Sequence, residues 1–324
     1  MKPISAVVPI FFLLAVAVEA QLPPLPEARG RLIDVGGRKL HLLCTGQGSP
    51  TVVLEAGASS FAIDWTLVQG EVSKTNRTCS YDRAGMGWSD ESTPGTRASS
   101  AVDLHRLLAA ASEKAPFVLV GASRGGLLIR AYVLEYPDDV AGLVFVDPAS
   151  EDRLFTMIDG QGILIADVTP EQLKSTFPTQ AVKIPRRNPQ RGSPFDKLPP
   201  DLYALRIRLD EKLIASTPDS VAPDVVGESQ EAERAFLARL KATRAGNNHP
   251  LGDRPTVVLS RGDEPNAERE AVHEALANLS TNSRHSIVAG AGHEIHLFQP
   301  AAVIQAIADV VKAIREKSQL PRRN

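Results

Sequence analysis

The sequence lacks three features that would point to whole classes of protein. Its formal net charge is only −2 over 324 residues, which gives no electrostatic basis for binding nucleic acid or an anionic membrane surface. It has only two cysteines, and it has no internal repeat or long low-complexity tract. The remaining composition, 43% hydrophobic and 23% charged, is that of a globular protein with room for one or two domains.

A long apolar run is also missing, although a short one stands near the N-terminus. Residues 6–18 are almost wholly apolar and follow Lys2, and Val18-Glu19-Ala20 then offers small residues at the two positions that a signal peptidase reads. This run is shorter than the roughly 20 apolar residues that a transmembrane helix needs. We therefore expect residues 1–20 to be a cleavable signal peptide, with an uncleaved anchor as the alternative, and the mature chain to be secreted or periplasmic with no stable membrane span.

Short runs rich in Val and Leu alternate with helical stretches through most of the chain. This alternation predicts an α/β fold, with an eight-stranded, mostly parallel sheet and helices on both faces. The expected strands are 31–35, 39–44, 51–54, 78–81, 117–120, 143–146, 256–259 and 286–289. The last helix is expected over residues 300–317, because its apolar residues recur at helical spacing.

The alternation stops between the sixth and seventh expected strands, where amphipathic helical segments replace core strands. We interpret this stretch as an inserted helical lid. The expected organisation is a Pro-rich spacer over 21–29, a core formed by 30–147 and 253–318, and a helical cap over 148–252.

The strongest chemical motif is Gly121-Ala122-Ser123-Arg124-Gly125, which lies directly between a buried strand and a helix. Small neighbours allow a sharp, strained turn that projects the serine hydroxyl at the carboxyl edge of the sheet. The helix N-terminus at this point favours developing negative charge. We therefore predict Ser123 as a nucleophile, in preference to an incidental serine in a Gly-rich turn.

A serine hydroxyl needs a general base, and His293 follows the last expected strand in Gly290-Ala291-Gly292-His293. This position brings the imidazole to the same sheet edge as Ser123, with His296 as the main rival. The third member of such a triad orients the imidazole. Asp263 follows the seventh strand and gives the chain order Ser, Asp, His, whereas Asp147 at the end of the sixth strand is the competing acid.

An oxyanion hole requires two backbone N–H groups aimed at one point. One is expected from Arg124, the residue after the nucleophile, and the other from the loop after the third strand. In that loop Ala58 is the first choice and Ser59 the second, because Gly57 allows the backbone to approach closely.

Taken together, these motifs resemble the α/β-hydrolase superfamily, specifically its lid-bearing esterase and aminopeptidase-like branch. Three stretches carry the resemblance. The first is the turn around Ser123, residues 121–125, which is called the elbow from here on. The other two are Tyr81-Asp82-Arg83-Ala84-Gly85-Met86-Gly87-Trp88-Ser89-Asp90 and Gly292-His293-Glu294-Ile295-His296-Leu297-Phe298-Gln299-Pro300. There are two departures. Glu55-Ala56-Gly57 stands where many relatives have His-Gly, and the elbow carries Arg124, either as a solvated side chain or as a rim cation that favours an acidic substrate.

The resemblance also bears on the two cysteines. The strand order of the family places the second and fourth strands side by side, and Cys44 ends one while Cys79 begins the other. It therefore implies that a disulfide is geometrically reasonable; two buried thiols are the alternative.

The function expected from these residues is hydrolysis of a carboxylic ester through an acyl-enzyme, on a small-molecule ester or amide. An amidase, peptidase or lactonase would use the same triad, and a catalytically silent, hydrolase-like binding protein is a remote alternative. The resemblance disfavours epoxide hydrolases and haloalkane dehalogenases, because those families carry an Asp nucleophile. No cofactor is expected. No metal site is expected either, because His293 and His296 lack the four-residue spacing of a two-histidine zinc helix.

Overall fold

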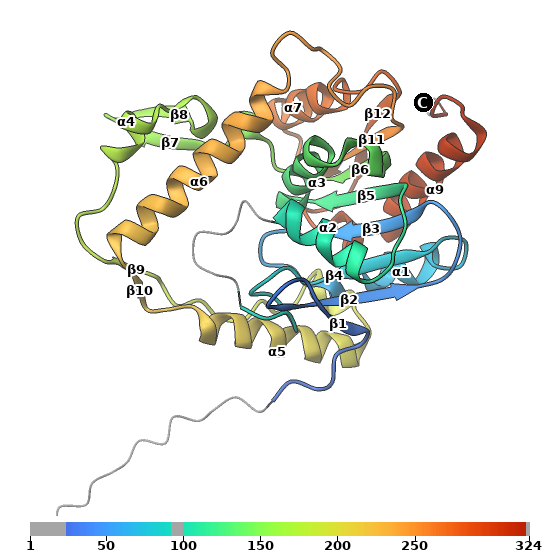
Figure 1. Cartoon of the computed structure of the whole chain (residues 1–324), viewed down its shortest axis with the longest axis horizontal. Coiled ribbons are helices and arrows are strands. Elements are labelled where there is room, and N and C mark those ends of the chain that lie inside the picture. Colours follow the sequence, from blue (N-terminus) through green and yellow to red (C-terminus); the bar gives the residue numbers. More distant parts are fainter. Residues whose placement is uncertain (1–23, 92–99, 322–324) are drawn as a thin grey trace, which may run out of the picture.

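The computed structural model describes residues 24–91 and 100–321. The predicted signal peptide over residues 1–20 and the start of the spacer lie outside this part. One eight-stranded sheet forms the centre of the molecule (Figure 1). Its strands are β1 (Arg31–Asp34), β2 (Lys39–Thr45), β3 (Thr51–Glu55), β4 (Thr78–Tyr81), β5 (Phe117–Ala122), β6 (Val140–Val146), β11 (Thr256–Gly262) and β12 (Ser283–Ala289).

The sheet order is β1-β2-β4-β3-β5-β6-β11-β12, and it is mixed rather than wholly parallel. The pairs from β4 to β12 are parallel, whereas β2 runs antiparallel to both β1 and β4. The predicted eight-stranded, mostly parallel α/β fold is thus confirmed, with two antiparallel strands at one edge. The carboxyl ends of β3, β5, β6, β11 and β12 meet at a common edge, as they must in parallel pairing.

Helices cover both faces, because the central strands are apolar on both sides. One face packs against α2 (Ser100–Ala110), α3 (Arg124–Glu135) and α7 (Ala267–Ala277), with Leu107, Ile129 and Leu276 in the shared apolar cluster. The other face packs against α1 (Thr66–Val72) and α9 (Pro300–Glu316), with Val68 and Ile307 in a second cluster. None of the helices in the described ranges is both long and apolar enough to cross a membrane.

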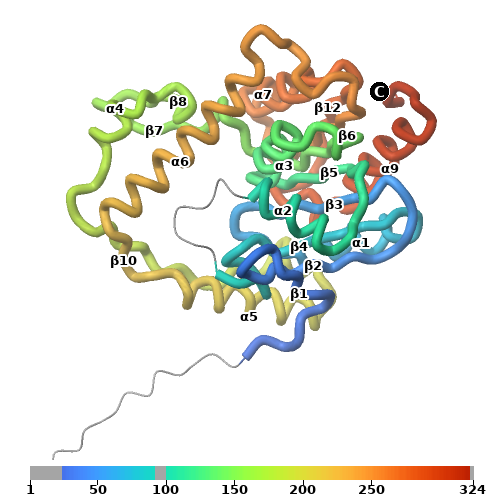
Figure 2. The backbone as a smooth tube through the Cα atoms, in the orientation of Figure 1, coloured from blue at the N-terminus to red at the C-terminus, as the bar shows by residue number. Residues whose placement is uncertain are grey.

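The insertion between β6 and β11 forms a separate lobe beside the sheet, as the course of the backbone shows (Figure 2). Its helices are α4 (Pro170–Lys174), α5 (Pro200–Ser216) and α6 (Pro223–Ala242). It also holds two small antiparallel pairs, β7 (Phe155–Ile158) with β8 (Gln161–Leu164) and β9 (Val182–Lys183) with β10 (Ser220–Val221). The sequence predicts a helical lid without core strands. The strands that the lobe adds are short and mostly unburied, so they leave no buried apolar pattern in the sequence.

The two cysteines are joined. Cys44 on β2 lies opposite Cys79 on β4 in the antiparallel register, and the structure contains a disulfide between them. This bond links the antiparallel edge of the sheet to its parallel part.

Candidate active site

Ser123 lies at the turn between β5 and α3, in a strained backbone conformation. Its φ of 51° and ψ of −121° are unusual for a residue with a side chain, and such strain is typical of functional sites. Two flanking glycines make the turn possible. A Cβ on Gly121 would lie 2.5 Å from the carbonyl oxygen of Gly125, and a Cβ on Gly125 would lie 2.5 Å from that of Glu55. The motif therefore has its glycines where the backbone leaves no room for a side chain.

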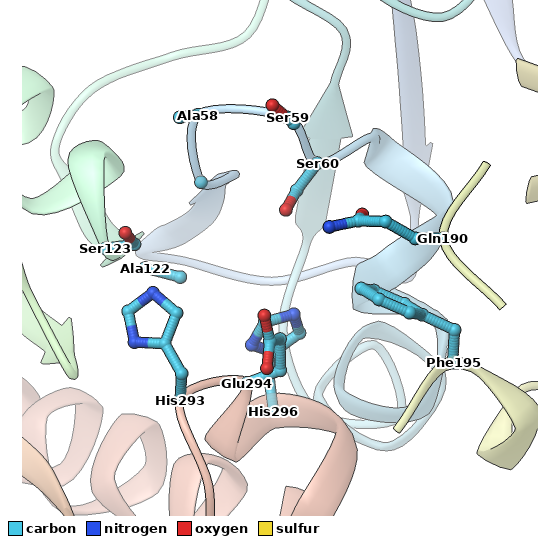
Figure 3. Close-up of a pocket in the computed structure, with 11 residues that line it drawn as sticks. Ala58, Ser59, Ser60, Ala122, Ser123, Gln190, Phe195, His293, Glu294 and His296 are labelled. Atoms are coloured by element: carbon cyan, nitrogen blue, oxygen red, sulfur yellow. The ribbon is translucent and has the colours of Figure 1, made fainter. Parts of the chain in front are cut away.

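The turn is fixed by hydrogen bonds to β6 and to the segment that follows it. The Ser123 N–H donates to the carbonyl of Val146 at 3.0 Å, and the Ser123 carbonyl accepts from Ala149 at 2.9 Å. The hydroxyl lines a cavity of about 150 Å³. The residues that line this cavity are Gly57, Ala58, Ser59, Ser60, Ala122, Ser123, Gln190, Phe195, His293, Glu294 and His296 (Figure 3).

His293 lies on the loop after β12 and lines the same cavity as Ser123, with its ring turned toward the serine (Figure 3). Its Nδ1 lies 2.6 Å from Oδ2 of Asp147. Because a carboxylate only accepts hydrogen bonds, Nδ1 carries the proton and Nε2 is left as the acceptor in the neutral ring. The structure therefore brings together a serine hydroxyl, an imidazole and a carboxylate at one sheet edge.

The protonation of this pair is set by their contact. The hydrogen bond to Asp147 raises the pKa of His293 above its ordinary value, against the opposing effect of burial. Burial also works to raise the pKa of Asp147, but the hydrogen bonds from His293 and from the Arg261 amide outweigh it and lower that pKa. The carboxylate is thus held ionised beside the imidazole.

The predicted acid, Asp263, does not contact His293. Its side chain is 39% exposed, and its Oδ1 accepts a hydrogen bond from the amide of Glu264 at 2.9 Å. The Asp147 side chain is only 4% exposed and makes the contact that Asp263 was expected to make. The prediction of Asp263 as the partner of His293 is therefore corrected in favour of Asp147, the alternative named above. Asp263 lies just beyond β11, and its side chain turns outward.

Asp147 is held between the ends of two strands, β6 and β11. It leaves β6 with a positive φ of 40°, its N–H donates to the Leu259 carbonyl at 2.7 Å, and its Oδ1 accepts from the Arg261 amide at 3.1 Å. These contacts come from β11, so β11 supplies the support for the acid rather than the acid itself.

A chain of buried hydrogen bonds also fixes the residue after Asp147. Nε2 of His273 lies 2.9 Å from the Pro148 carbonyl, and its Nδ1 lies 2.5 Å from the hydroxyl of Ser260. That hydroxyl is also 2.7 Å from Nε2 of His285. Burial lowers the pKa of His273 to about 4, so the ring is neutral at pH 7 and donates from Nε2 to the carbonyl. No local motif marks these residues in the sequence, because they come from β11, α7 and β12.

The two expected oxyanion donors come from the residue after Ser123 and from the wall of the same cavity. Arg124 is the first residue of α3, where an amide has no acceptor within the helix. Ala58 lies in the loop after β3 and lines the cavity, and within the described residues its amide donates to no other backbone carbonyl. Ser59, the second choice, lines the same cavity. A Cβ on Gly57 would lie 3.5 Å from the Ser123 Cβ, so this loop runs close to Ser123.

Arg83 holds the loop after β3 in place through hydrogen bonds to its carbonyls. Its guanidinium donates to the carbonyls of Ala56 at 2.7 Å and Ala58 at 3.2 Å, and also to that of Gly57. It pairs at the same time with Glu55, whose side chain is 2% exposed. Glu55 is the residue that departs from the His-Gly pattern, and here it pairs with the arginine that binds the loop carbonyls.

Asp82, the first residue after β4, stabilises the rest of the loop that follows this strand. Its carboxylate accepts from the Ala62 amide at 2.8 Å and lies 2.7 Å from Nδ1 of His41. A Cβ on Gly87 would lie 2.2 Å from this carboxylate, which explains the glycine. Most of the motif around Arg83 is thus structural.

The side chain of Arg124 is not a free cation at the rim. Its guanidinium makes two hydrogen bonds to Glu233 on α6, at 2.7 and 2.6 Å, and lies over the ring of Phe236. The charge is therefore paired with the lobe, which removes the basis for expecting an acidic substrate from this residue.

His296, the rival base, is buried against Trp65, with ring centroids 4.5 Å apart. Burial lowers its pKa to about 3. Asp147 contacts His293 and not His296, so the geometry favours His293 as the base.

Among the described residues, one group of potential metal ligands lies close together: Cys44, Cys79 and Glu113. The two cysteines are bonded to each other, and Glu113 pairs with Arg77 at 2.6 Å. This group offers no thiolate to a metal ion.

Comparison with known proteins places most of the chain in one family. The alpha/beta hydrolase fold family matches residues 50–300. Among curated proteins, YqjL of Bacillus subtilis is 25% identical over 272 residues, covering 82% of this chain and 85% of that protein. The AB hydrolase superfamily protein of Gibberella zeae is 33% identical over 107 residues, covering 32% of this chain and 33% of its own length. A Hormonema carpetanum protein named as a transporter, efuK, is 27% identical over 238 residues, but the match spans only 30% of it.

Solved structures show the same fold at lower identity. A thermophilic esterase from Thermogutta terrifontis is 20% identical, with a TM-score of 0.57, and the match covers 89% of this chain and 99% of that one. An esterase from Exiguobacterium antarcticum is 19% identical, with a TM-score of 0.56 and coverage of 87% and 99%.

Proposed function

Because this chain belongs to the α/β-hydrolase fold family, whose profile matches residues 50–300, we propose that it is a serine hydrolase that cleaves a carboxylic ester through an acyl-enzyme. The observation that carries this proposal is the contact between His293 and the buried Asp147, beside a cavity that Ser123 also lines. The esterases named above support an ester as the substrate.

In the proposed first step, Nε2 of His293 takes the proton of the Ser123 hydroxyl while Oγ attacks the ester carbonyl carbon. The carbonyl oxygen becomes an oxyanion, which the amides of Arg124 and Ala58 stabilise. The carbon–oxygen bond to the alcohol then breaks, and the alcohol leaves with the proton from His293. Water repeats the sequence on the acyl-enzyme and releases the acid.

Asp147 acts on His293 rather than on the substrate. It keeps the proton on Nδ1, so that Nε2 faces the serine, and it stabilises the imidazolium that forms during attack. The strained backbone at Ser123 and the fixed loop around Ala58 mean that the reacting groups need little rearrangement.

The test is covalent labelling together with activity. A fluorophosphonate probe should modify the wild-type protein at Ser123, and Ser123→Ala should lose labelling and at least about a thousandfold in ester hydrolysis. Ser216→Ala, at an exposed lobe serine, is the matched control and should keep both. Full activity in Ser123→Ala would refute the proposal, and an unlabelled, inactive wild-type protein would favour a hydrolase-like binding protein. Anilides and lactones in the same assay separate ester cleavage from amidase, peptidase and lactonase activity.

We also propose that the mature chain is secreted or periplasmic. The disulfide between Cys44 and Cys79 supports this, because such bonds persist in oxidising compartments. Cell fractionation and N-terminal sequencing test it: the mature protein should begin at Gln21 outside the cytoplasm, and a cytoplasmic protein with two alkylatable thiols would contradict it.

A further inference from the structure

The cavity beside Ser123 is small and has a polar wall. Its volume of about 150 Å³ is below the roughly 300–1,000 Å³ of sites for drug-sized ligands. Across it from Ser123, the view shows the hydroxyl of Ser60, the amide of Gln190 and the carboxylate of Glu294 around the cavity, with the ring of Phe195 beside them (Figure 3). A purely hydrocarbon chain would leave these polar groups without partners.

The amide of Gln190 presents its NH₂ end to the cavity. Its Oε1 already accepts a hydrogen bond from Nη2 of Arg206 at 2.8 Å, so its remaining capacity is mainly that of a donor. Arg206 is fully buried, lies 3.2 Å from Asp64, and stacks 3.6 Å above the ring of Phe195. One immobilised arginine thus positions both lobe residues of the cavity.

Glu294 supplies the opposite kind of group. It follows His293, and its carboxylate accepts no hydrogen bond and forms no ion pair within the described residues. A carboxylate can only accept, so the cavity offers an acceptor at Glu294 and a donor at Gln190.

We propose that this cavity selects a short ester that carries a hydroxyl group on its acid or alcohol part, an inference that rests on the proposed ester hydrolysis. A hydroxyl matches both sides of the wall, because it donates to Glu294 and accepts from Gln190. An ammonium group could satisfy Glu294 only, and a second carboxylate would be repelled by Glu294. The small volume leaves no room inside the cavity for a long acyl chain.

The probes are two pairs of esters in which a methyl group replaces the hydroxyl without changing shape. Methyl 3-hydroxybutanoate is compared with methyl 3-methylbutanoate, and 2-hydroxypropyl acetate with isobutyl acetate, by acid release in a pH-stat. The pairs distinguish a hydroxyl on the acid part from one on the alcohol part. We expect the hydroxyl ester to have a kcat/KM about tenfold higher in one pair, a moderate preference because the cavity is partly open to solvent.

In Glu294→Met, the kcat/KM values of the hydroxyl ester and its methyl counterpart should differ by less than about threefold. Any effect of Glu294 on His293 acts on both esters and cancels in their ratio. Glu264→Met, at an exposed acid that does not line the cavity, is the matched control and should keep the ratio. If Glu294→Met does not fold, as judged by loss of Ser123 labelling, Gln190→Met tests the donor side in the same way.

Monomethyl succinate, methyl 3-aminobutanoate and methyl decanoate should all be poorer substrates than the preferred hydroxyl ester. The inference is overturned if neither hydroxyl ester is preferred, or if the long, anionic or amino ester is hydrolysed faster. It is also overturned if Glu294→Met and Gln190→Met both fold and leave the ratio unchanged. The proposed function would survive all of these results, whereas it fails if no ester is hydrolysed and Ser123 is not labelled.

Discussion

On one side of the cavity, Ser123, His293 and Asp147 lie on loops at the carboxyl ends of buried parallel strands, and their contacts are backbone hydrogen bonds and one buried carboxylate. On the other side, Gln190 and Phe195 come from the lobe and are positioned through Arg206. The first side is set by strand register and the second by ionic and ring contacts between side chains. Substitutions on the strand side should therefore change the rate of the chemical step. Substitutions on the lobe side should change substrate preference or the position of the lobe.

The largest effect should separate the two carboxylates on the strand side. Asp147→Asn should lower kcat by about a thousandfold or more, because the amide no longer fixes the Nδ1–H tautomer of His293 or stabilises its charged form. Asp263→Asn, the matched substitution at the exposed acid, should change kcat by less than about threefold. Steady-state kinetics on one short ester measures both, and equal losses would remove the assignment of Asp147.

The pH profile of the same variants sharpens this comparison. The imidazole must be neutral to accept the serine proton, so kcat/KM falls as the pH drops through the pKa of His293, which Asp147 raises above its usual value near 6.5. The acidic limb of the wild-type profile should therefore lie above this value. It should move to lower pH in Asp147→Asn and stay in place in Asp263→Asn.

A smaller loss is expected where a core side chain holds the oxyanion loop. Arg83→Lys keeps a positive charge beside Glu55 but loses the fork that contacts three successive carbonyls. We expect kcat to fall about 10- to 100-fold with little change in KM, because the loop amide is misplaced only for the oxyanion. Labelling of Ser123 should slow in parallel, and a rise in KM with unchanged kcat would contradict this role.

The smallest effect should come from the contact that joins the two sides. Glu233→Gln removes the charge that pairs with Arg124, and a partly exposed pair of this kind contributes about 1 kcal/mol or less. We expect kcat/KM to change by about two- to fivefold. Added salt should lower the kcat/KM of the wild-type protein toward that of Glu233→Gln, and it should leave the kcat/KM of the variant nearly unchanged. A double-mutant cycle with Arg124→Gln that gives no coupling would show that the contact does not position the elbow.

The strands and the sharp turn that carries Ser123 could be predicted because their signals are local. Each core strand is a short apolar run, and Ser123 has its glycines, its strand and its helix within a few residues. The small strands of the lobe could not be predicted, because β7 to β10 are short, mostly unburied and show no apolar alternation.

The acid could not be chosen from the sequence because two aspartates follow adjacent strands at the same edge. Asp147 comes directly after β6 and is buried, whereas Asp263 follows the end of β11 and turns outward. The difference depends on the register of β6 against β11 and on the positive φ at Asp147, which no local pattern encodes. The partner of Arg124 was hidden for a similar reason: Glu233 is 109 residues away in the chain.

The bond between Cys44 and Cys79 has a mechanical consequence. β1 and β2 form the antiparallel edge, and their hydrogen bonds would separate one after another if the chain were pulled upstream of Arg31. That peeling would stop at Cys44, because the load would pass through a covalent bond to β4 and would then be shared with β3 across parallel pairing. The cavity lies beyond this point, at the ends of β3, β5 and β12. A pull at the N-terminal end would therefore act first on β1, β2 and the contact of His41 with Asp82, before it reached β5, which leads to Ser123.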